Sequence, residues 1–563
     1  MFVNKENVNI LTSLLIEHGV KRAVVCPGSR NAPIVHNLNE CGSIECYPVT
    51  DERSAGFYAL GMSLADDTPV VVCVTSGTAL LNLAPAVAEA TYQHHGLIVI
   101  SSDRPAAWIG QLDGQTLHQP DAFGCFVCKS VNLPEPHDEI ERWHCKRLAN
   151  KALMAVTVDG RMSVHINVPI SEPLFEFNVP KLPIVSKVHN IKPVLDARAF
   201  KCCVLSRMVE AKRPMLVVGQ INSCHDRIEE ALETIGKHVA VLSEPLSGGT
   251  QRLSDLAIAS IDNDNVADYS PDFLLYVGDT VVSKRLKRFL RDANIAEAWG
   301  VSSDGEVHDT FMCQTGVVKC SPVEALLAFS SYMEEIEDVN TRLGSDYAKK
   351  WNKLMDKVCE QAWCYEPRYS QMAAVREFEL SLGDMDYDWK VHYANSNAIR
   401  LACIYASHHV WCNRGVNGIE GSLSTAAGFS VAIRQAVVFC VIGDLSFFYD
   451  QNALWNTNLQ GNLRIILLNN SCGGIFYSLK GLRDSAAFDE LVTAHHTSDA
   501  KGICTQNDIG YLSARNMEEL RLGLATLMTT ASKRPMLLEV FTDAEEDKRV
   551  ISDFMKYIGN EGK

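Results

Sequence analysis

The chain has 563 residues, of which 47% are hydrophobic and 8% aromatic, and it carries a formal net charge of −16. At roughly 150 residues per domain this length predicts about three to four domains, and the apolar content excludes a disordered chain. The acidic balance excludes a surface for nucleic acid or anionic membranes, so cations that bind an anionic substrate must be concentrated in one site.

The start of the chain (MFVNKENVNILTSLLIEHGV) predicts a helix, because its apolar residues recur at helical spacing. It lacks the basic stretch and uninterrupted apolar core of a secretory signal, and no apolar run approaches the roughly 18 residues of a membrane span. The 19 cysteines are scattered, mostly inside apolar runs, as expected of free thiols in a reducing cytoplasm. Cys125 and Cys128 form a CxxC pair without a second ligand pair, so we expect them to pack rather than to bind zinc.

Short apolar runs alternate with amphipathic helical stretches along the chain, which predicts parallel sheets covered by helices. The first third contains RAVVCPGS, VVVCVTSGT, LIVISSDR and SVHINVPI, and the proline-rich residues 171–193 predict a linker. A second block contains RPMLVVGQ, HVAVLSEP and FLLYVGDT. A polar helical region over residues 330–362 leads to a third block with HVWCNRG, QAVVFCVIGD, LRIILLNN and PMLLEVF. We predict an α/β protein of three doubly wound, mostly parallel domains spanning residues 1–180, 190–355 and 365–563.

The first and third blocks share a weak similarity. Glu52 in DERSAGFYALG and Glu420 in IEGSLSTAAG each precede a helix start that is rich in small residues. A duplicated fold explains this similarity, and so does chance likeness between helices rich in alanine and glycine.

Two apolar runs of the third block end in groups that ligate metals through oxygen. QAVVFCVI ends in Gly443 and Asp444, and LRIILL ends in Asn469 and Asn470, 26 positions beyond the aspartate (470 − 444). Because ligands of open parallel sheets bind beyond the carboxyl ends of the strands, we expect both ends to meet at one edge. A carboxylate, an amide oxygen and a nearby carbonyl suit a Mg²⁺ ion bound to a diphosphate, which Gly443 lets approach the backbone. The alternative is two ordinary strand-to-helix turns capped by Asp and Asn.

This spacing resembles the diphosphate-binding motif of thiamine diphosphate enzymes, in which GDG is followed by a similar spacer and NN. Leu445 replaces the second glycine of that motif. The resemblance implies that Asp444, Asn470 and the backbone carbonyl of Cys472 ligate Mg²⁺, or Mn²⁺ in its place. Cys472 stands where the family more often has glycine. The cofactor contacts that the resemblance implies also include Gly443, Leu445, Ser446 and Ile475.

A thiamine diphosphate enzyme also needs a glutamate that hydrogen-bonds the aminopyrimidine ring and favours its imino tautomer. Glu52 in YPVTDERSAGFYALG is the candidate for cofactor binding and catalysis, and a carboxylate near that apolar ring should have a raised pKa. Taken alone, Glu52 would be a first-turn glutamate favoured by the helix dipole. Ile419 in GVNGIEG matches the family's apolar wedge beneath the bent cofactor and would otherwise be a core residue.

Several further segments narrow the resemblance to one family. VCPGSRNAPIV, TDERSAGFYALG, VTSGTALLNLAPAVAEA, DGQTLHQP, SKRL, NSNAIR, NRGVNGIEGSLSTAAG and GDLSFFYDQNAL occur in this order. Together they resemble the SEPHCHC synthases (2-succinyl-5-enolpyruvyl-6-hydroxy-3-cyclohexene-1-carboxylate synthases) of menaquinone biosynthesis. The resemblance implies a transferase that decarboxylates 2-oxoglutarate, adds the succinyl-equivalent carbanion to isochorismate and releases CO₂.

Both substrates of that reaction are acids, so cationic and polar residues must converge on them. Taken singly, SKRLKRFLR is typical of a solvated basic helix face, Arg30 could pair with a surface acid, and the IFYSL run could be core. The resemblance implies substrate contacts from Ser29, Arg30, Gln115, Lys284, Arg285, Ser396, Arg400 and Arg414, with Phe476 and Leu479 beside Ile475 in an apolar wall.

The family places the residues that match Glu52 and Asp444 on opposite subunits, which implies a homodimer or homotetramer with active sites at the subunit interface. The nearest alternative is another thiamine diphosphate-dependent 2-oxo acid carboligase or decarboxylase, such as an acetolactate synthase, although a small apolar substrate needs fewer cations. A non-catalytic binding protein is disfavoured by the intact Glu52, Asp444 and Asn470. A nicotinamide-dependent dehydrogenase is disfavoured because no GxGxxG follows a strand. We expect neither nucleic acid nor membrane as a partner.

Overall fold

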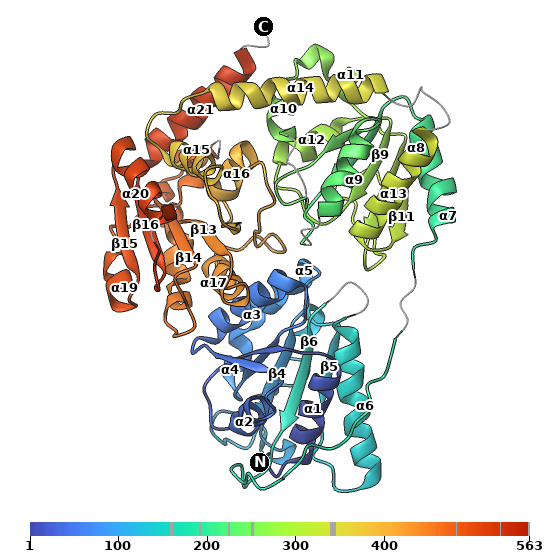
Figure 1. The fold of residues 1–563 in the computed structure, drawn as a ribbon, viewed down its shortest axis with the longest axis vertical. Helices are drawn as coiled ribbons and strands as arrows, with labels where there is room; N and C mark the ends of the chain where they lie inside the picture. Colours follow the sequence, from blue (N-terminus) through green and yellow to red (C-terminus); the bar gives the residue numbers. More distant parts are fainter. Residues whose placement is uncertain are drawn as a thin grey trace.

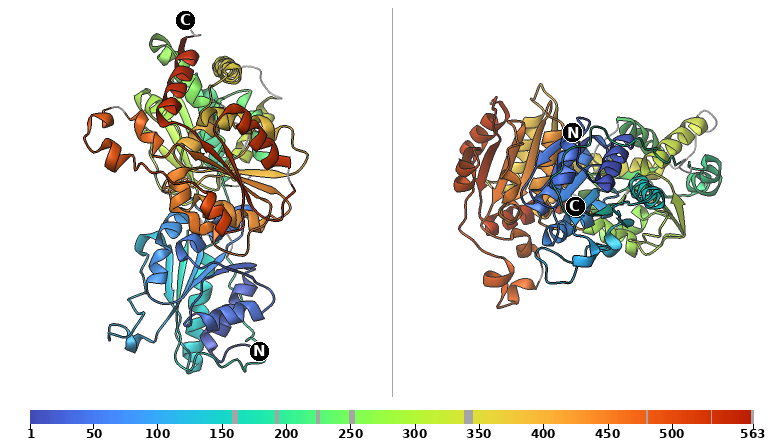
Figure 2. Two further views of the ribbon diagram at one scale, coloured as in Figure 1. Left: turned by 90° about the vertical axis from the view of Figure 1, so that its left-hand side faces the viewer. Right: turned by 90° about the horizontal axis from the view of Figure 1, so that it is seen from below.

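The computed structural model describes residues 1–157, 162–190, 194–222, 226–248, 253–337, 345–479, 481–529 and 531–560. Three parallel sheets flanked by helices make up this part of the chain, which confirms the predicted α/β class (Figure 1). The first domain lies below the other two in Figure 1 and in the side view of Figure 2. Within the described ranges, no helix combines the length and the apolarity that crossing a membrane requires.

The first sheet has the strand order β2-β1-β3-β4-β6-β5. Its central strands are buried on both faces: Val72 and Val74 of β3 face one apolar core, and Val71 and Cys73 face another. The elements are α1 (Glu6–Glu17), β1 (Arg22–Val25), α2 (Ala32–Glu40), β2 (Glu45–Pro48), α3 (Glu52–Asp66), β3 (Val71–Val74), α4 (Thr78–Asn82), α5 (Ala84–Tyr92), β4 (Ile98–Asp103), β5 (Lys129–Asn132), α6 (Glu139–Ala155) and β6 (Val164–Pro169).

The predicted linker leads from the first domain to the central one (Figure 1). Its described residues, 171–190, carry neither helix nor strand apart from an isolated bridge between Phe2 and Val179. The central sheet then has the order β11-β10-β9-β7-β8. Its elements are α7 (Ala197–Phe200), α8 (Ser206–Glu210), β7 (Pro214–Val218), α9 (Asp226–Gly236), β8 (Ala240–Leu242), α10 (Ser254–Ser260), α11 (Val266–Tyr269), β9 (Phe273–Val277), α12 (Lys284–Asp292), β10 (Glu297–Ser302), β11 (Gly316–Lys319) and α13 (Pro322–Glu337).

The third sheet has the order β12-β13-β14-β16-β15, and α14 (Ser345–Cys364) crosses from the central domain towards it (Figure 1). The remaining elements are α15 (Gln371–Leu382), β12 (Trp389–Tyr393), α16 (Asn397–Tyr405), α17 (Ser422–Ala432), β13 (Val437–Gly443), α18 (Asp444–Tyr449), β14 (Leu463–Asn469), the 3₁₀ helix η6 (Gly474–Ser478), α19 (Lys501–Gln506), β15 (Gly510–Ala514), α20 (Met517–Thr529), β16 (Met536–Phe541) and α21 (Ala544–Asn560).

The strand expected in HVWCNRG is reduced to a single parallel bridge between Trp411 and His392. The chain leaves the sheet there because the buried carboxylate of Glu89, in the first domain, accepts the amide hydrogens of Gly415 and Val416 at 2.7 Å each. Counted as the strand at the edge of the third sheet, this bridge lies next to β12 as β2 lies next to β1 in the first sheet, and the order of the remaining strands is then the same in both sheets. This shared topology favours a duplicated fold over chance likeness.

The first and third domains share one apolar core, in which α3 packs directly against α17. Small residues allow the two helix backbones to touch. A Cβ atom on Gly61 would lie 1.9 Å from the carbonyl oxygen of Thr425, and one on Gly428 would lie 2.0 Å from that of Tyr58. The two helix starts that look alike in the sequence therefore belong to helices that pack against each other.

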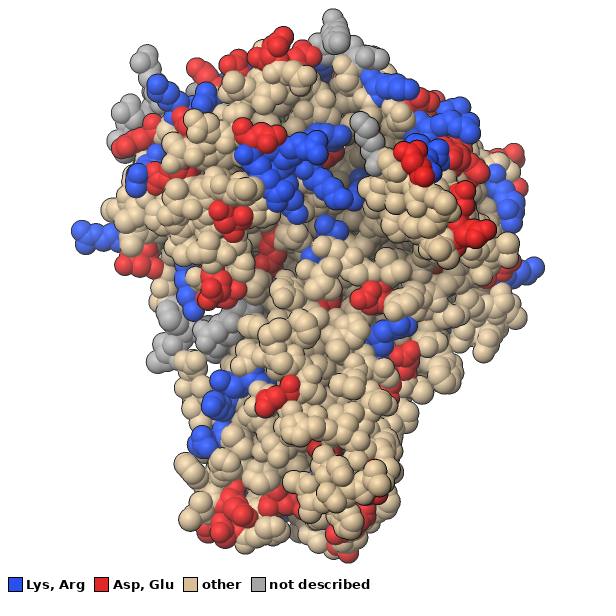
Figure 3. Space-filling view, turned by 180° about the vertical axis from the view of Figure 1, so that it is seen from behind, with Lys and Arg blue, Asp and Glu red and all other residues tan. Residues whose placement is uncertain are grey.

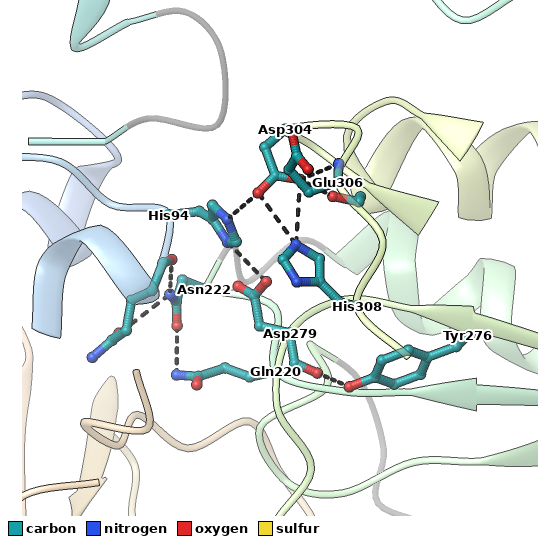
Figure 4. A network of polar contacts seen from close by, with 10 residues as sticks. His94, Gln220, Asn222, Tyr276, Asp279, Asp304, Glu306 and His308 are labelled. Atoms are coloured by element: carbon teal, nitrogen blue, oxygen red, sulfur yellow. Dashed lines mark hydrogen bonds and ion pairs between the residues drawn. The ribbon is translucent and has the colours of Figure 1, made fainter. Parts of the chain in front are cut away.

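His94 joins the first domain to the central one (Figure 4). Its Nδ1 lies 2.8 Å from Asp279 Oδ1, and its Nε2 lies 3.5 Å from Asp304 Oδ2. Burial disfavours a charged imidazole, but the hydrogen bonds to the two carboxylates outweigh burial and raise the pKa of His94 to about 10. Nearby, the side chain of Asn222 donates to the backbone carbonyl of Gln93 at 3.1 Å. A protonated His94 thus holds the first domain against the ends of β9 and β10.

Candidate active site

The two halves of the GD…NN motif meet at one edge of the third sheet. Strands β13 and β14 are parallel neighbours, with Gly443 paired to Leu468. Asp444 begins α18 and is 4% exposed. Its Oδ2 accepts the amide hydrogens of Asn470 at 3.1 Å and Cys472 at 3.2 Å, and its Oδ1 accepts that of Leu445 at 2.7 Å. The turn after β14 is therefore tied to the aspartate that follows β13.

Asn470 is oriented by a second buried carboxylate. Its side-chain nitrogen, Nδ2, donates to Asp547 Oδ2 at 3.2 Å. Asp547 also accepts hydrogen bonds from the Gln371 backbone amide and the Thr542 hydroxyl. Burial raises the pKa of Asp547 to about 6. The side-chain oxygen of Asn470 accepts only a long contact from the Cys472 thiol, at 3.9 Å, so it keeps a lone pair for a ligand.

The donor chemistry of this edge fits a hard divalent cation with a diphosphate. A carboxylate, an amide oxygen and a backbone carbonyl are oxygen donors of the kind that Mg²⁺ prefers. A Cβ atom on Gly443 would meet nothing within 4 Å, so the backbone borders open space where an anion can approach. A Cβ atom on Gly474 would lie 2.4 Å from the Asn470 amide nitrogen, so the following turn needs a glycine to pass the asparagine. Ser446 is buried in the first turn of α18, and Leu445 beside it is half-buried.

A cavity of about 440 Å³ lies between the central and third domains. It is lined by Lys284 and Arg285 from the start of α12 and by Arg400 from α16. Seen from behind, the upper half of the molecule shows Lys and Arg side chains gathered beside a hollow (Figure 3). Ser478, at the end of η6, also lines the cavity, so the cavity extends to the chain segment that follows Asn470.

Three of the four cations that line this cavity form no ion pair within the described part of the chain. Lys284, Arg400 and a further lining residue, Arg288, form no hydrogen bond or ion pair with another described residue, whereas Arg285 pairs with Asp255. Burial, and then the neighbouring Arg414, lowers the pKa of Arg400. Crowded cations without counter-ions favour an anionic ligand with more than one carboxylate.

Two carboxylates hold the start of α12, which presents Lys284 and Arg285 to the cavity. Glu244 is 4% exposed and accepts the amide hydrogens of Val282 at 2.6 Å and Ser283 at 2.8 Å. Burial raises its pKa. Asp255 accepts hydrogen bonds from the Ser283 hydroxyl and from Arg285.

Sequence reasoning missed Glu244, Asp255 and Arg288. Of these, only Arg288 left a sequence signal, because it lies four positions after Lys284 on the same helix face (288 − 284). Asn397, which begins α16 and also lines the cavity, was missed as well.

The predicted residues of the first domain form a separate group at the carboxyl edge of the first sheet. Glu52 begins α3 and accepts a hydrogen bond from Asn82 at 3.1 Å. Arg30 is buried and donates to the Ile170 carbonyl, and it also pairs with Glu172 at 3.0 Å, as the alternative of a surface partner anticipated. Ser29 beside it is exposed. Gln115 donates to the Ser76 carbonyl at 3.3 Å.

The remaining predicted residues lie in the third domain. Ser396 precedes α16 with a φ of 76°, and Arg414 donates to Asn395 at 3.1 Å. Ile419 is 42% exposed in the loop before α17, so it is not the core residue that its apolar side chain alone would suggest. Ile475 and Phe476 are half-buried in η6, and Leu479 after it is exposed.

Within one chain, the structure therefore brings together the proposed metal ligands and part of the cation set. Asp444, Asn470 and Cys472 meet at one edge, and Lys284, Arg285 and Arg400 line one cavity. The described lining of that cavity comes from the central and third domains, and the first-domain group of Glu52, Ser29, Arg30 and Gln115 is not part of it.

Comparisons with known proteins identify the family of the chain. Residues 6–123 match the family model "Thiamine pyrophosphate enzyme, N-terminal TPP binding domain". A relative from Phocaeicola vulgatus is 41% identical, and the match covers 100% of both chains. One from Bacteroides thetaiotaomicron is 41% identical over 98% of this chain and 99% of its own, and one from Porphyromonas gingivalis is 33% identical over 100% and 98%. All three are named 2-succinyl-5-enolpyruvyl-6-hydroxy-3-cyclohexene-1-carboxylate synthase. The chain belongs to this family of SEPHCHC synthases.

Proposed function

We propose that this protein is a thiamine diphosphate- and Mg²⁺-dependent transferase of menaquinone biosynthesis. It decarboxylates 2-oxoglutarate and adds the succinyl-equivalent carbanion to isochorismate, giving 2-succinyl-5-enolpyruvyl-6-hydroxy-3-cyclohexene-1-carboxylate and CO₂, the product for which its relatives are named. Family membership supports the cofactor and the reaction class.

One observation carries the choice of substrates. The cavity that reaches the segment after Asn470 is lined by Lys284, Arg288 and Arg400, which form no ion pair with a described residue. Two dicarboxylic acids can supply the missing negative charges, whereas a small monocarboxylate such as pyruvate leaves most of these cations unpaired. The cation set therefore favours 2-oxoglutarate and isochorismate over an acetolactate synthase reaction.

Each group of residues has a distinct role in this proposal. Asp444, Asn470 and the Cys472 carbonyl would hold the metal and, through it, the diphosphate, with Mn²⁺ able to replace Mg²⁺. Bound thiamine diphosphate would supply the electron sink that stabilises the carbanion. Glu52 would exchange a proton with the aminopyrimidine ring, and Ile419 would support the bent cofactor. The half-buried Ile475 and Phe476 would limit the access of water.

The proposal includes a homodimer or homotetramer in the cytoplasm. Glu52 makes its hydrogen bond within the first domain, and the oxygen donors lie at the carboxyl edge of the third sheet. A second copy that brings its own Glu52 to this edge would complete the site. Exposed apolar residues in both domains, including Leu112 and Ile419, support such a contact.

The direct test combines purified protein with thiamine diphosphate, Mg²⁺, 2-oxoglutarate and isochorismate, and follows CO₂ release and the adduct by mass spectrometry. We expect 2-oxoglutarate consumption that depends on isochorismate. Pyruvate consumption that equals or exceeds it would favour the acetolactate synthase alternative. Cofactor binding without CO₂ release from any 2-oxo acid would favour a binding protein.

Replacing Asp444 with alanine tests the metal edge. Loss of this carboxylate should abolish the Mg²⁺-dependent part of thiamine diphosphate binding, measured by calorimetric titration with and without the metal. An unchanged dissociation constant in the presence of Mg²⁺ would contradict the assignment.

Replacing Glu52 with glutamine tests the proton-exchanging role. The Glu52→Gln variant should bind the cofactor normally but lose roughly 10²- to 10⁴-fold in turnover, the usual contribution of general acid–base catalysis. Turnover close to that of the wild type would remove Glu52 from the reaction.

A further inference from the structure

His496 lies beside the Asp444 carboxylate, 52 positions later in the chain (496 − 444), and no sequence motif includes it. Its Nε2 is 3.3 Å from Asp444 Oδ2, and its side chain is 16% exposed. The Phe448 ring meets the imidazole edge to face, with the ring centroids 5.3 Å apart. The imidazole is thus held between the Phe448 ring of α18 and the Asp444 carboxylate.

The backbone around His496 fixes which ring nitrogen carries the proton. The amide hydrogen of His496 bonds to the Ser471 carbonyl at 3.0 Å, which ties this loop to the turn after β14. The amide of Ser498 donates to Nδ1 at 3.1 Å, so Nδ1 acts as an acceptor. In the neutral imidazole the proton must then lie on Nε2, the nitrogen that faces Asp444.

The donors around Asp444 are divided unequally between its two oxygens. Oδ2 accepts the amide hydrogens of Asn470 and Cys472 and has His496 Nε2 as a third neighbour. Oδ1 accepts only the amide hydrogen of Leu445 among the described residues. A carboxylate oxygen offers about two lone pairs, so Oδ2 is filled by the protein and Oδ1 keeps one free.

The His496 nitrogen has no better partner. Nε2 is buried and forms no well-aligned hydrogen bond within the described part of the chain. A buried N–H without a partner costs free energy, so a small rotation that improves the contact with Oδ2 is favourable. The contact with Asp444 Oδ2 therefore also fixes which of the two carboxylate oxygens faces the protein.

We propose that His496 is a positioning residue that keeps the Asp444 carboxylate turned so that Oδ2 faces the backbone amides of Asn470 and Cys472 and Oδ1 is left to ligate the divalent cation. One-oxygen ligation suits Mg²⁺, which demands octahedral geometry, whereas Ca²⁺ accepts seven or eight ligands and readily takes both oxygens of a carboxylate. His496 therefore contributes to metal selectivity as well as to affinity. This inference rests on the thiamine diphosphate site proposed above.

The test measures thiamine diphosphate binding by calorimetry in Mg²⁺ and in Ca²⁺, without substrates. Removing an outer partner of a metal ligand typically costs about 10- to 100-fold in metal affinity, so His496→Ala should weaken Mg²⁺-dependent binding by roughly 10-fold or more. Without the imidazole the carboxylate can rotate away from the two backbone amides, so both oxygens can reach the larger ion and the preference for Mg²⁺ over Ca²⁺ should fall. His496→Gln keeps an N–H donor and should restore most of the wild-type preference.

His495→Ala is the matched control, because the neighbouring imidazole is exposed and contacts the Tyr477 hydroxyl at 3.1 Å instead of Asp444. It should leave both affinities within about 2-fold of the wild type. Equal losses in Mg²⁺ and Ca²⁺ for His496→Ala would overturn the proposal and indicate a direct contact with the diphosphate or a loosened loop. Unchanged affinities would overturn it as well. Failure of the wild-type protein to bind the cofactor at all would instead refute the proposed site.

Discussion

The contact between α3 and α17 gives a sharp prediction about the joint between the first and third domains. In Gly428→Ala the added Cβ atom would lie 2.0 Å from the Tyr58 carbonyl oxygen, whereas side-chain Cβ atoms essentially never come closer than 3.0 Å. The two helices must therefore separate by about 1.0 Å (3.0 − 2.0). The obstacle is backbone, so no side-chain rotation relieves it.

The expected cost follows from two opposing terms. Overpacking of a buried contact typically costs about 1–3 kcal/mol, and a backbone obstacle places this contact at the upper end. Alanine is a better helix former than glycine by about 1 kcal/mol, which offsets part of that cost. We expect Gly428→Ala to lower the free energy of unfolding by about 2 kcal/mol.

The assay is urea unfolding followed by tryptophan fluorescence and circular dichroism. Gly502→Ala in α19 is the matched control, because a Cβ atom there meets nothing within 4 Å. This variant should be stabilised by about 0.5–1 kcal/mol through helix propensity alone. If Gly428→Ala, like Gly502→Ala, is at least as stable as the wild type, the close approach of α3 and α17 is refuted.

Two further predictions concern pH. Burial lowers the pKa of His409 to about 3, below its unfolded value near 6.5, so its contribution to stability is present above pH 6.5 and is lost as the pH falls. His409→Phe should therefore flatten the decline of the unfolding free energy between pH 6.5 and 4 by up to about 1.4 kcal/mol per pH unit. Burial raises the pKa of Asp450 to about 7, so its contribution is present below about pH 4 and is lost as the pH rises through 7. Asp450→Asn should reduce the pH dependence between 4 and 7, and an unchanged profile in either variant would contradict that assignment.

The sequence by itself determined the fold class and the placing of Asp444 and Asn470 at one edge of the third sheet. The central strands are continuous apolar runs because both faces of a parallel sheet are covered, and this makes them visible without a structure. The motif residues Asp444 and Asn470 could be placed together because neighbouring parallel strands end at one edge. Edge strands such as β2 and β11 escaped prediction, since they are only partly buried and carry no such run.

Only the tertiary structure decided which charged groups lie together and which already have partners. Arg30 and Lys284 look alike as basic residues in the sequence, yet Arg30 is paired with Glu172, and Lys284 faces a cavity without an ion pair to any described residue. His496 reaches Asp444 through a loop that no motif marks. Hydrophobic periodicity reports how a residue is buried against its own sheet or helix. The pairing of charges depends on distances between segments far apart in the chain, which periodicity does not encode.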